Sequence, residues 1–579
     1  MTHRYYQQQL HNLRELAKEF SRVHPAVAPF LGGESRDPDV ERLLEGVAFL
    51  TGLVSERIDD EFPELIHSLT SLVFPHHLRP IPSLALVAFA PKPSLMEPVR
   101  VGRGTVLASR PVEGEPCQFR TCFDLEVHPL RLLRCEHVQR NPGASSIVLD
   151  FELLNIDLGQ WRPNQFLLFL GGPLNTAANL LFHLTRNLQE ICLESQNGGE
   201  ILRLPPRLLH PIGFQSEGAL FPYPRRVFAG FQILQEYFSL PQKNLFLQLD
   251  GWDRWDKRGS GNRFQIRFEL GRLTEEHPLP PLQDDSFILG ATPVVNLFSL
   301  DAEPVPFDVT KPRIRINPSQ RRPHAFSVYT VDQVVGFTRG TVQQRLYRPV
   351  DDFAEVEQDV PVYQVIRRIS PVHGQVETFL DFSYPGDSVF QSDETLSVDL
   401  TCTNGRLPEQ LLLGDICMET ANSPGLLSFK NITVPTLQID PPIGQGSLWK
   451  LLSHLSLNFN SLGHIEGLRS ILETYLTMHD RDRQKVTAIR KRIEGLEEMH
   501  IQPIDRIVQG IMLRGQKISM KVRRSHFSGV GDLCLFGTVL DIFLSEYSGL
   551  NCFTELEMID VDSGEEFRWP ARLGNRPLI

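Results

Sequence analysis

The chain lacks the sequence features of secreted, membrane-spanning and nucleic-acid-binding proteins. Its first residues, MTHRYYQQQL, contain no apolar run after a basic start, so no signal peptide is expected. No segment approaches the ~18 apolar residues that a membrane-spanning helix requires, and the runs at 84–90 and 166–172 have the length of strands. The net charge of −12 argues against a basic face that could neutralise phosphates. Only 8 cysteines occur in 579 residues, which fits a reducing compartment, so we expect a soluble cytoplasmic protein.

Catalytic motifs are lacking as well. The chain contains no HExxH and no GxSxG sequence. The segment GIMLRGQK (510–517) comes near a phosphate-binding loop, but Gln516 stands where that loop needs lysine. The carboxylate pairs at 59–60 and 351–352 are adjacent in sequence, so their side chains point apart on a helix or a strand. We therefore predict no catalytic residue, no cofactor and no enzymatic activity.

A metal site is the remaining chemical possibility that the residue types raise. Five possible ligands lie close in sequence: Cys117, Cys122, His128, Cys135 and His137. Structural zinc sites place paired ligands two to four residues apart on tight turns, whereas QFRT between the first two cysteines is typical of a strand. Buried small side chains are therefore the favoured interpretation over zinc. The adjacent rings of His76 and His77 diverge, which disfavours a shared metal.

Length and composition predict a multidomain α+β protein. A single core seldom grows past ~250–300 residues, and the chain is about twice that length. Its 43 prolines and 41 glycines favour many short strands joined by turns. We predict an N-terminal helical bundle segment (1–82), a β-rich domain with inserted helices (83–276), a second β-rich domain (277–440) and a C-terminal helical domain with β-hairpins (441–579).

The N-terminal segment carries two apolar patterns of helical period. In the helix expected over 5–23, apolar residues alternate at spacings of four and three, as in a coiled-coil seam: Tyr6, Leu10, Leu13, Ala17 and Phe20. This seam could pack on the next helices of the same chain or on a partner subunit, and the two alternatives are compatible. A helix that begins at Asp37–Pro38 follows, and it is apolar on several faces: Val40, Leu43, Leu44, Val47, Leu50, Val54 and Ile58. Pro63 begins a further helix, and Pro75, Pro80 and Pro82 end helical structure.

Strand and helix periods alternate in the rest of the chain. Strict alternation over 147–153, 264–270 and 396–402 predicts half-buried strands. Helices are expected over 174–188, 231–238, 448–455, 465–476, 486–496 and 532–547. The proline-rich runs at 277–285 and 439–447 are the expected boundaries. Near the C-terminus we expect a strand pair over 511–522 with a turn at Gly515, and a hairpin around 562–564.

Trp252 and Trp255 lie in DGWDRWDKRGSGN, which predicts a hairpin tip. Tryptophans at such tips anchor protein interfaces, pack into the core or form platforms for sugars. Protein contact is the favoured alternative, core anchoring is the second and sugar binding is the third.

Long segments of the chain resemble the TssF family, baseplate subunits of bacterial type VI secretion systems that are also called ImpG or VasA. The resemblance rests on DPDVERLLEGVAFL and FPHHLRPIPS near the N-terminus, on residues 213–251 in the middle, and on 529–556 and WPARLG at the end. These motifs occur in the family's order along nearly the full length. CTNGRLP (402–408) departs from the family pattern at Gly405.

The resemblance implies a structural role. Two TssF copies would join one TssG, and TssK would attach, so that wedges assemble around the spike hub where the tail tube and sheath begin. It also implies docking at the inner-membrane complex. We expect the partner interface to include Tyr6, Leu10, Leu13, Phe20, Val40, Leu44, Val47, Trp252 and Trp255. A baseplate wedge protein of a contractile phage tail and a β-rich carbohydrate-active enzyme are the alternatives.

Overall fold

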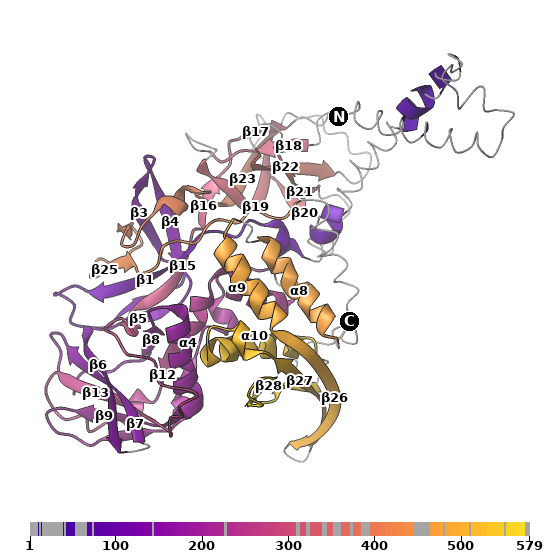
Figure 1. The fold of residues 1–579 in the computed structure, drawn as a ribbon. Helices are drawn as coiled ribbons and strands as arrows, with labels where there is room; N and C mark the ends of the chain where they lie inside the picture. The colour runs from indigo at the N-terminus through magenta and orange to yellow at the C-terminus, as the bar shows by residue number, and fades with distance from the viewer. Residues whose placement is uncertain are drawn as a thin grey trace. The chain divides into compact units, whose positions relative to one another are not determined.

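The computed structural model describes most of the chain after residue 73 and short helical stretches before it. The described residues are 10, 13, 39, 42–43, 45–51, 66–71, 74–141, 144–224, 228–307, 313–319, 325–338, 344–350, 361–370, 374–383, 394–443, 464–478, 481–508, 511–548 and 552–573. The chain forms two compact units: Met1–Val73 with Ile443–Leu452, and Phe74–Pro442 with Ser453–Ile579. Helices and several sheets occur together (Figure 1), which confirms the α+β multidomain class.

The described residues of Met1–Val73 are all helical. Residues 45–51 and 66–71 lie in helices, as the apolar periods predict. The hydroxyls of Thr51 and Thr70 donate hydrogen bonds to the backbone carbonyls of Val47 and Ile66, each at 2.7 Å. This bond to the carbonyl four residues earlier is common for threonine within a helix. The helix predicted over 448–455 lies outside the described residues.

The second unit begins with a sheet built from three distant parts of the sequence. In spatial order its strands are β24 (Ile416–Met418), β3 (Val106–Val112), β4 (Glu115–Thr121), β15 (Ala291–Val295), β1 (Leu84–Pro91) and β25 (Leu427–Asn431). β1 pairs with β15 on one side and with β25 on the other, both antiparallel. The segments predicted as separate β-rich domains, 83–276 and 277–440, therefore share this sheet. A small ribbon of β2 (Val99–Val101) and β5 (Leu125–Val127) accompanies it.

Two further sheets carry the strands of the first β-rich segment. One contains β10 (Leu202–Leu204), β9 (Leu188–Ser195), β13 (Arg263–Leu270), β7 (Ala144–Leu153) and β6 (Leu130–Asn141). The other contains β11 (Leu209–Pro211), β12 (Phe246–Leu249), β8 (Leu167–Leu170) and β14 (Phe287–Leu289). Phe264, Ile266 and Phe268 of β13 are fully buried, which confirms the strand predicted over 264–270.

The second β-rich segment forms an eight-stranded sheet with its own core. Its strands are β16 (Phe298–Asp301), β23 (Glu394–Thr403), β19 (Ser327–Thr338), β20 (Gln344–Pro349), β21 (Val362–Ile369), β22 (Val376–Ser383) and β18 (Arg313–Ile316), with β17 (Val305–Phe307) beside β23. The alternation predicted over 396–402 is confirmed in β23, where Leu396, Val398 and Leu400 are buried. Gly405 follows with a φ of +54°, in the left-handed region that glycine adopts without strain.

The C-terminal part combines three helices with a sheet. Its elements are α8 (Ile465–Met478), α9 (Arg483–Glu494), β26 (Leu496–Val508), β27 (Ile511–Val522), α10 (Val530–Glu546), β28 (Cys552–Asp560), β29 (Glu566–Arg568) and β30 (Arg572–Leu573). α10 packs on α4 (Leu174–Phe182) and on α5 (Ala229–Ser239). A Cβ at Gly531 would lie 2.2 Å from the carbonyl carbon of Ala178, so only glycine permits this approach of α10 to α4. No helix of the described residues is long and apolar enough to cross a membrane.

Three local predictions have clear outcomes here. The hairpin around 562–564 is confirmed by the pairing of β28 with β29. The turn at Gly515 is wrong, because β27 runs through that residue and the glycine instead makes room for the Phe553 ring, 2.5 Å from where a Cβ would stand. The single helix over 174–188 is also wrong in part: α4 ends at Phe182, a π-helical turn (η3, His183–Asn187) follows, and Leu188 begins β9.

Candidate functional site

An apolar stripe in the first unit is the candidate interaction surface. Leu43, Val47 and Leu50 stand four and three positions apart in a helical stretch, and their exposed fractions are 68%, 44% and 63%. Residues at this spacing lie on one face of a helix. Ala48, which points away from the stripe, is fully buried. Ala48 is the one buried residue of the described stretch 45–51, so this helix exposes apolar side chains on more than one side, and Phe49 is 49% exposed as well.

The other predicted interface residues of this unit divide into two groups. Leu10 is buried and Leu13 is half-buried, both in helical conformation. Tyr6, Phe20, Val40 and Leu44 lie outside the described residues. Val47 is exposed. The interface role of all seven residues, Val47 included, stays a prediction.

Protein contact is the alternative that the sequence favours for Trp252 and Trp255, but neither side chain is exposed. Trp252 and Trp255 are only 3% and 2% exposed. Their rings join Trp161 and Phe264 in one aromatic cluster, with the ring centroids of Trp161 and Trp252 5.1 Å apart. Rings this deeply buried offer almost no surface to a partner or a sugar, so core anchoring is the alternative that the structure supports.

A buried arginine that sequence analysis missed organises this tryptophan cluster. Arg258 is 2% exposed, and its guanidinium donates to the backbone carbonyls of Trp252 (2.7 Å), Trp255 (2.6 Å) and Trp161. Burial lowers the pKa of Arg258 to about 10. In the sequence this residue stands in a charged, glycine-containing stretch that predicts only a solvated loop, so no local pattern marks it as buried.

Of the five residues weighed as zinc ligands, Cys117, Cys122 and His128 are buried, Cys135 is half-buried and His137 is exposed. Burial raises the pKa of the Cys117 thiol to about 11 and of the Cys122 thiol to about 12, which disfavours the thiolate that zinc requires. His128 bonds the carbonyl of Gln165 at 2.8 Å, and His137 bonds the hydroxyl of Ser145 at 2.5 Å. Small buried side chains remain the favoured interpretation of this segment.

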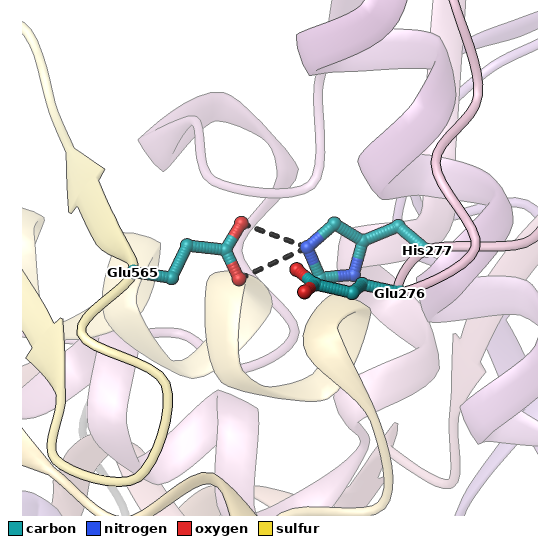
Figure 2. A group of neighbouring side chains, drawn as sticks. All are labelled: Glu276, His277 and Glu565. Carbon is teal, nitrogen blue, oxygen red and sulfur yellow. Dashed lines mark hydrogen bonds and ion pairs between the residues drawn. The ribbon is translucent and has the colours of Figure 1, made fainter.

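A different group of possible metal ligands comes together far from those residues. Figure 2 shows His277 and Glu276, from the segment after β13, facing Glu565 from the β28–β29 turn. His277 Nε2 lies 2.7 and 2.9 Å from the two carboxylate oxygens of Glu565. On the other side of the ring, Arg524 Nη2 lies 3.3 Å from Nδ1. No short motif marks this group, because its members are 288 positions apart in sequence.

The partners of His277 indicate an ion-paired clamp rather than a metal centre. An arginine N–H can only donate, so Nδ1 is the acceptor and the ring proton sits on Nε2, where it is donated to Glu565. A metal at Nε2 would need that lone pair free. The Arg524 guanidinium lies 3.8 Å from Glu565, so it already supplies the positive charge that a metal ion would otherwise bring to this carboxylate.

The segment that resembles a phosphate-binding loop is part of a paired β-strand. Residues 511–517 belong to β27, and Lys517 pairs with Glu557 at 2.8 Å. A phosphate-binding loop needs a turn that opens a helix, and this segment is a paired strand. The carboxylate pairs at 59–60 and 351–352 lie outside the described residues.

Comparison with known proteins shows similarity over the whole chain. The profile of the family described as "Type VI secretion system, TssF" matches residues 1–576. The type VI secretion system component TssF1 of Pseudomonas aeruginosa is 28% identical, with 99% of each sequence covered. A chain in a solved TssK–TssF–TssG baseplate subcomplex has a TM-score of 0.76 and 28% identity, covering 93% of this chain and 99% of that one. A chain in a solved type VI baseplate complex has a TM-score of 0.63 and 27% identity, with both chains covered completely.

Proposed function

The chain belongs to the TssF family and is a baseplate subunit of the type VI secretion system, and we propose that it assembles there through the exposed helical stripe of its first unit. TssG and TssK, which share the solved subcomplex with TssF, are its partners. The finer arrangement is part of the proposal: a second copy of the chain beside one TssG, TssK attached, and contacts to the spike hub, the tail tube and sheath, and the membrane complex.

The observation that carries the proposal is the exposure of Leu43, Val47 and Leu50 at coiled-coil spacing. Fully burying a leucine or valine side chain stabilises an interface by roughly 1.5–3 kcal/mol relative to leaving it in water. Three such side chains in line provide a seam for one helix of a partner subunit. Leu13 and Phe20, seven positions apart in the helix predicted over 5–23, extend the seam in this proposal.

The proposed role is structural rather than enzymatic. The tryptophans that motivated the carbohydrate alternative are buried in the aromatic cluster, so that alternative has lost the observation on which it depended. Location in the cytoplasm and docking at the inner-membrane complex belong to the same proposal. A phage-tail wedge protein would share the physics of the seam, but the similarity over 1–576 is to the secretion-system family.

The test is co-purification with TssG and TssK after co-expression. The double variant Leu43→Glu, Leu50→Glu should lose TssG while the isolated chain keeps its helical and strand content by circular dichroism. Glu45→Lys, on the exposed opposite face of the same helix, is the matched control and should co-purify normally. Normal TssG recovery with the double variant would overturn the seam.

A further inference from the structure

The second unit contains a cavity of about 260 Å³ that is separate from the proposed seam. It lies between the end of α5, the η6 turn (Pro241–Leu245), the loop at 433–436 and one face of α9. Leu240 and Ile489 are among its apolar lining residues, and Val434, also in the lining, is 52% exposed. Its volume is below the ~300–1,000 Å³ of small-molecule sites and suits one or two side chains.

Two cationic side chains two turns apart on α9, Lys485 and Arg492, line this cavity, and among the described residues only Arg492 has a carboxylate partner. Arg492 is held by Asp532, whose Oδ1 lies 3.0 Å from Nη2. Lys485 donates from Nζ to the backbone carbonyl of Ser239 at 2.9 Å. Among the described residues no carboxylate lies within ion-pair distance of this Nζ; Asp482 instead caps the helix by accepting from the Lys485 backbone N–H at 3.1 Å.

A second polar group in the cavity lining is independent of the lysine. Ser239 is 4% exposed, and its hydroxyl has no hydrogen-bond partner among the described residues. Leaving a buried hydroxyl without a partner costs about 1–3 kcal/mol, and this one is sealed from solvent in the free chain, so a ligand would satisfy it only if the side chain turned toward the cavity. The ammonium of Lys485 reaches the carbonyl of this same residue, so both donors belong to one end of the cavity.

We propose that this cavity binds an aspartate or glutamate side chain of a partner subunit, whose carboxylate accepts a hydrogen bond from Lys485 and a second from Ser239 once that hydroxyl turns toward the cavity, while its stem covers the apolar walls. One unpaired cation matches the single charge of a carboxylate, whereas phosphate sites gather several cations or backbone N–H groups. The choice of a protein ligand rests on the proposed function, because a subunit that works by assembly meets other chains at its surface.

Burial lowers the pKa of Lys485 to about 8, against a smaller opposing effect of Asp482. A carboxylate in contact with Nζ would favour the charged form and restore the ordinary pKa. The free subunit therefore bears a desolvation cost that the bound partner would remove.

The first test uses a water-soluble carbodiimide, which joins an amine to a carboxylate in direct contact. In the complex reconstituted with TssG and TssK, peptide mapping should find Lys485 linked to an aspartate or glutamate of another chain. The link should be absent from the isolated chain and from Lys485→Arg, which keeps the charge but presents no amine. A complex in which Lys485 is linked only to Asp482 of its own chain would overturn the proposal.

The second test separates binding from stability. Ser239→Ala should leave the melting temperature of the free chain unchanged or higher, since it removes an unpartnered hydroxyl, yet weaken complex formation about threefold or more. Lys485→Gln should weaken it about tenfold, and Lys491→Gln, an exposed lysine of the same helix, should have no effect. Unchanged affinity in both cavity variants would overturn the proposal. Failure of the wild-type chain to bind TssG and TssK would instead contradict the proposed function.

Discussion

His277 Nε2 donates to Glu565 at 2.7 Å and thereby joins the segment after β13 to the β28–β29 turn, 288 positions further along the chain. His277 is 8% exposed, and Arg524 holds the other side of the ring. The clamp thus connects the segment after β13 to the C-terminal sheet through one imidazole. The hydrogen bonds of His277 to Glu565 and Arg524 account for this grouping of three possible metal ligands without a metal ion.

Removing this clamp should loosen the C-terminal sheet. We expect His277→Ala to lower the free energy of unfolding by about 1.5 kcal/mol, because a partly buried charge-assisted hydrogen bond is lost. Chemical denaturation followed by circular dichroism measures the change. Glu275→Gln, two residues away and exposed, is the matched control and should leave stability unchanged. Equal stability of His277→Ala and wild type would show that the clamp contributes nothing.

The seam predicted in the first helix can be tested separately from the stripe at 43–50. Glutamate at Leu13 and Phe20 should abolish TssG co-purification, because a charge in an apolar seam is not compensated. The measurement is pull-down after co-expression, with circular dichroism of the isolated variant to verify folding. If the variant retains TssG at wild-type levels, this helix packs within its own chain instead.

The tryptophan cluster should behave as core. Trp255→Ala should destabilise the chain by roughly 3–5 kcal/mol, since a fully buried ring is removed. Arg258→Met should also destabilise it, because three backbone carbonyls lose their donor. Thermal unfolding monitored by tryptophan fluorescence reports both changes, and Asp253→Ala, exposed on the same loop, is the control. A stable Trp255→Ala variant that loses a partner would restore the interface interpretation.

The sheet of the C-terminal part should be sensitive to acid through Glu557. A hydrogen bond from Lys517 (2.8 Å), with a second from Arg568 (2.8 Å), holds the pKa of this 5% exposed carboxylate below its ordinary 4.5. Because the pKa is depressed in the folded chain, the contribution to stability is present above pH 4.5 and is lost as the pH falls through the folded value. Glu557→Gln should therefore cost about 1.5–3 kcal/mol at pH 7.

The corresponding measurement is urea denaturation of wild type and Glu557→Gln at pH 7 and at successively lower pH. The difference between them should shrink once the pH is below the ordinary carboxyl pKa of 4.5. Glu566→Gln, an exposed neighbour, should track the wild type throughout. A difference that stays constant down to low pH would show that the carboxylate charge is not what stabilises this sheet.

Local sequence patterns were sufficient to define many of the individual elements and the family. Strict alternation predicts β7, β13 and β23, and the dense apolar period predicts α10, because the identity of a residue and its near neighbours decides which face of a strand or helix is buried. The long motifs near both ends indicate the TssF family on their own. The exposed position of Val47 is consistent with the predicted seam, and the interface role of Leu13 and Phe20 stays a prediction.

Which distant elements contact one another could not be predicted from the sequence and is seen only in the tertiary structure. β1, β15 and β25 share a sheet, Trp252 and Trp255 close around Arg258, and Lys485 reaches Ser239 across 246 positions. The turn expected at Gly515 failed for the same reason, since that glycine admits Phe553 of a neighbouring strand. Such contacts depend on packing between segments that are far apart in sequence, and local periodicity carries no information about which segments pack together.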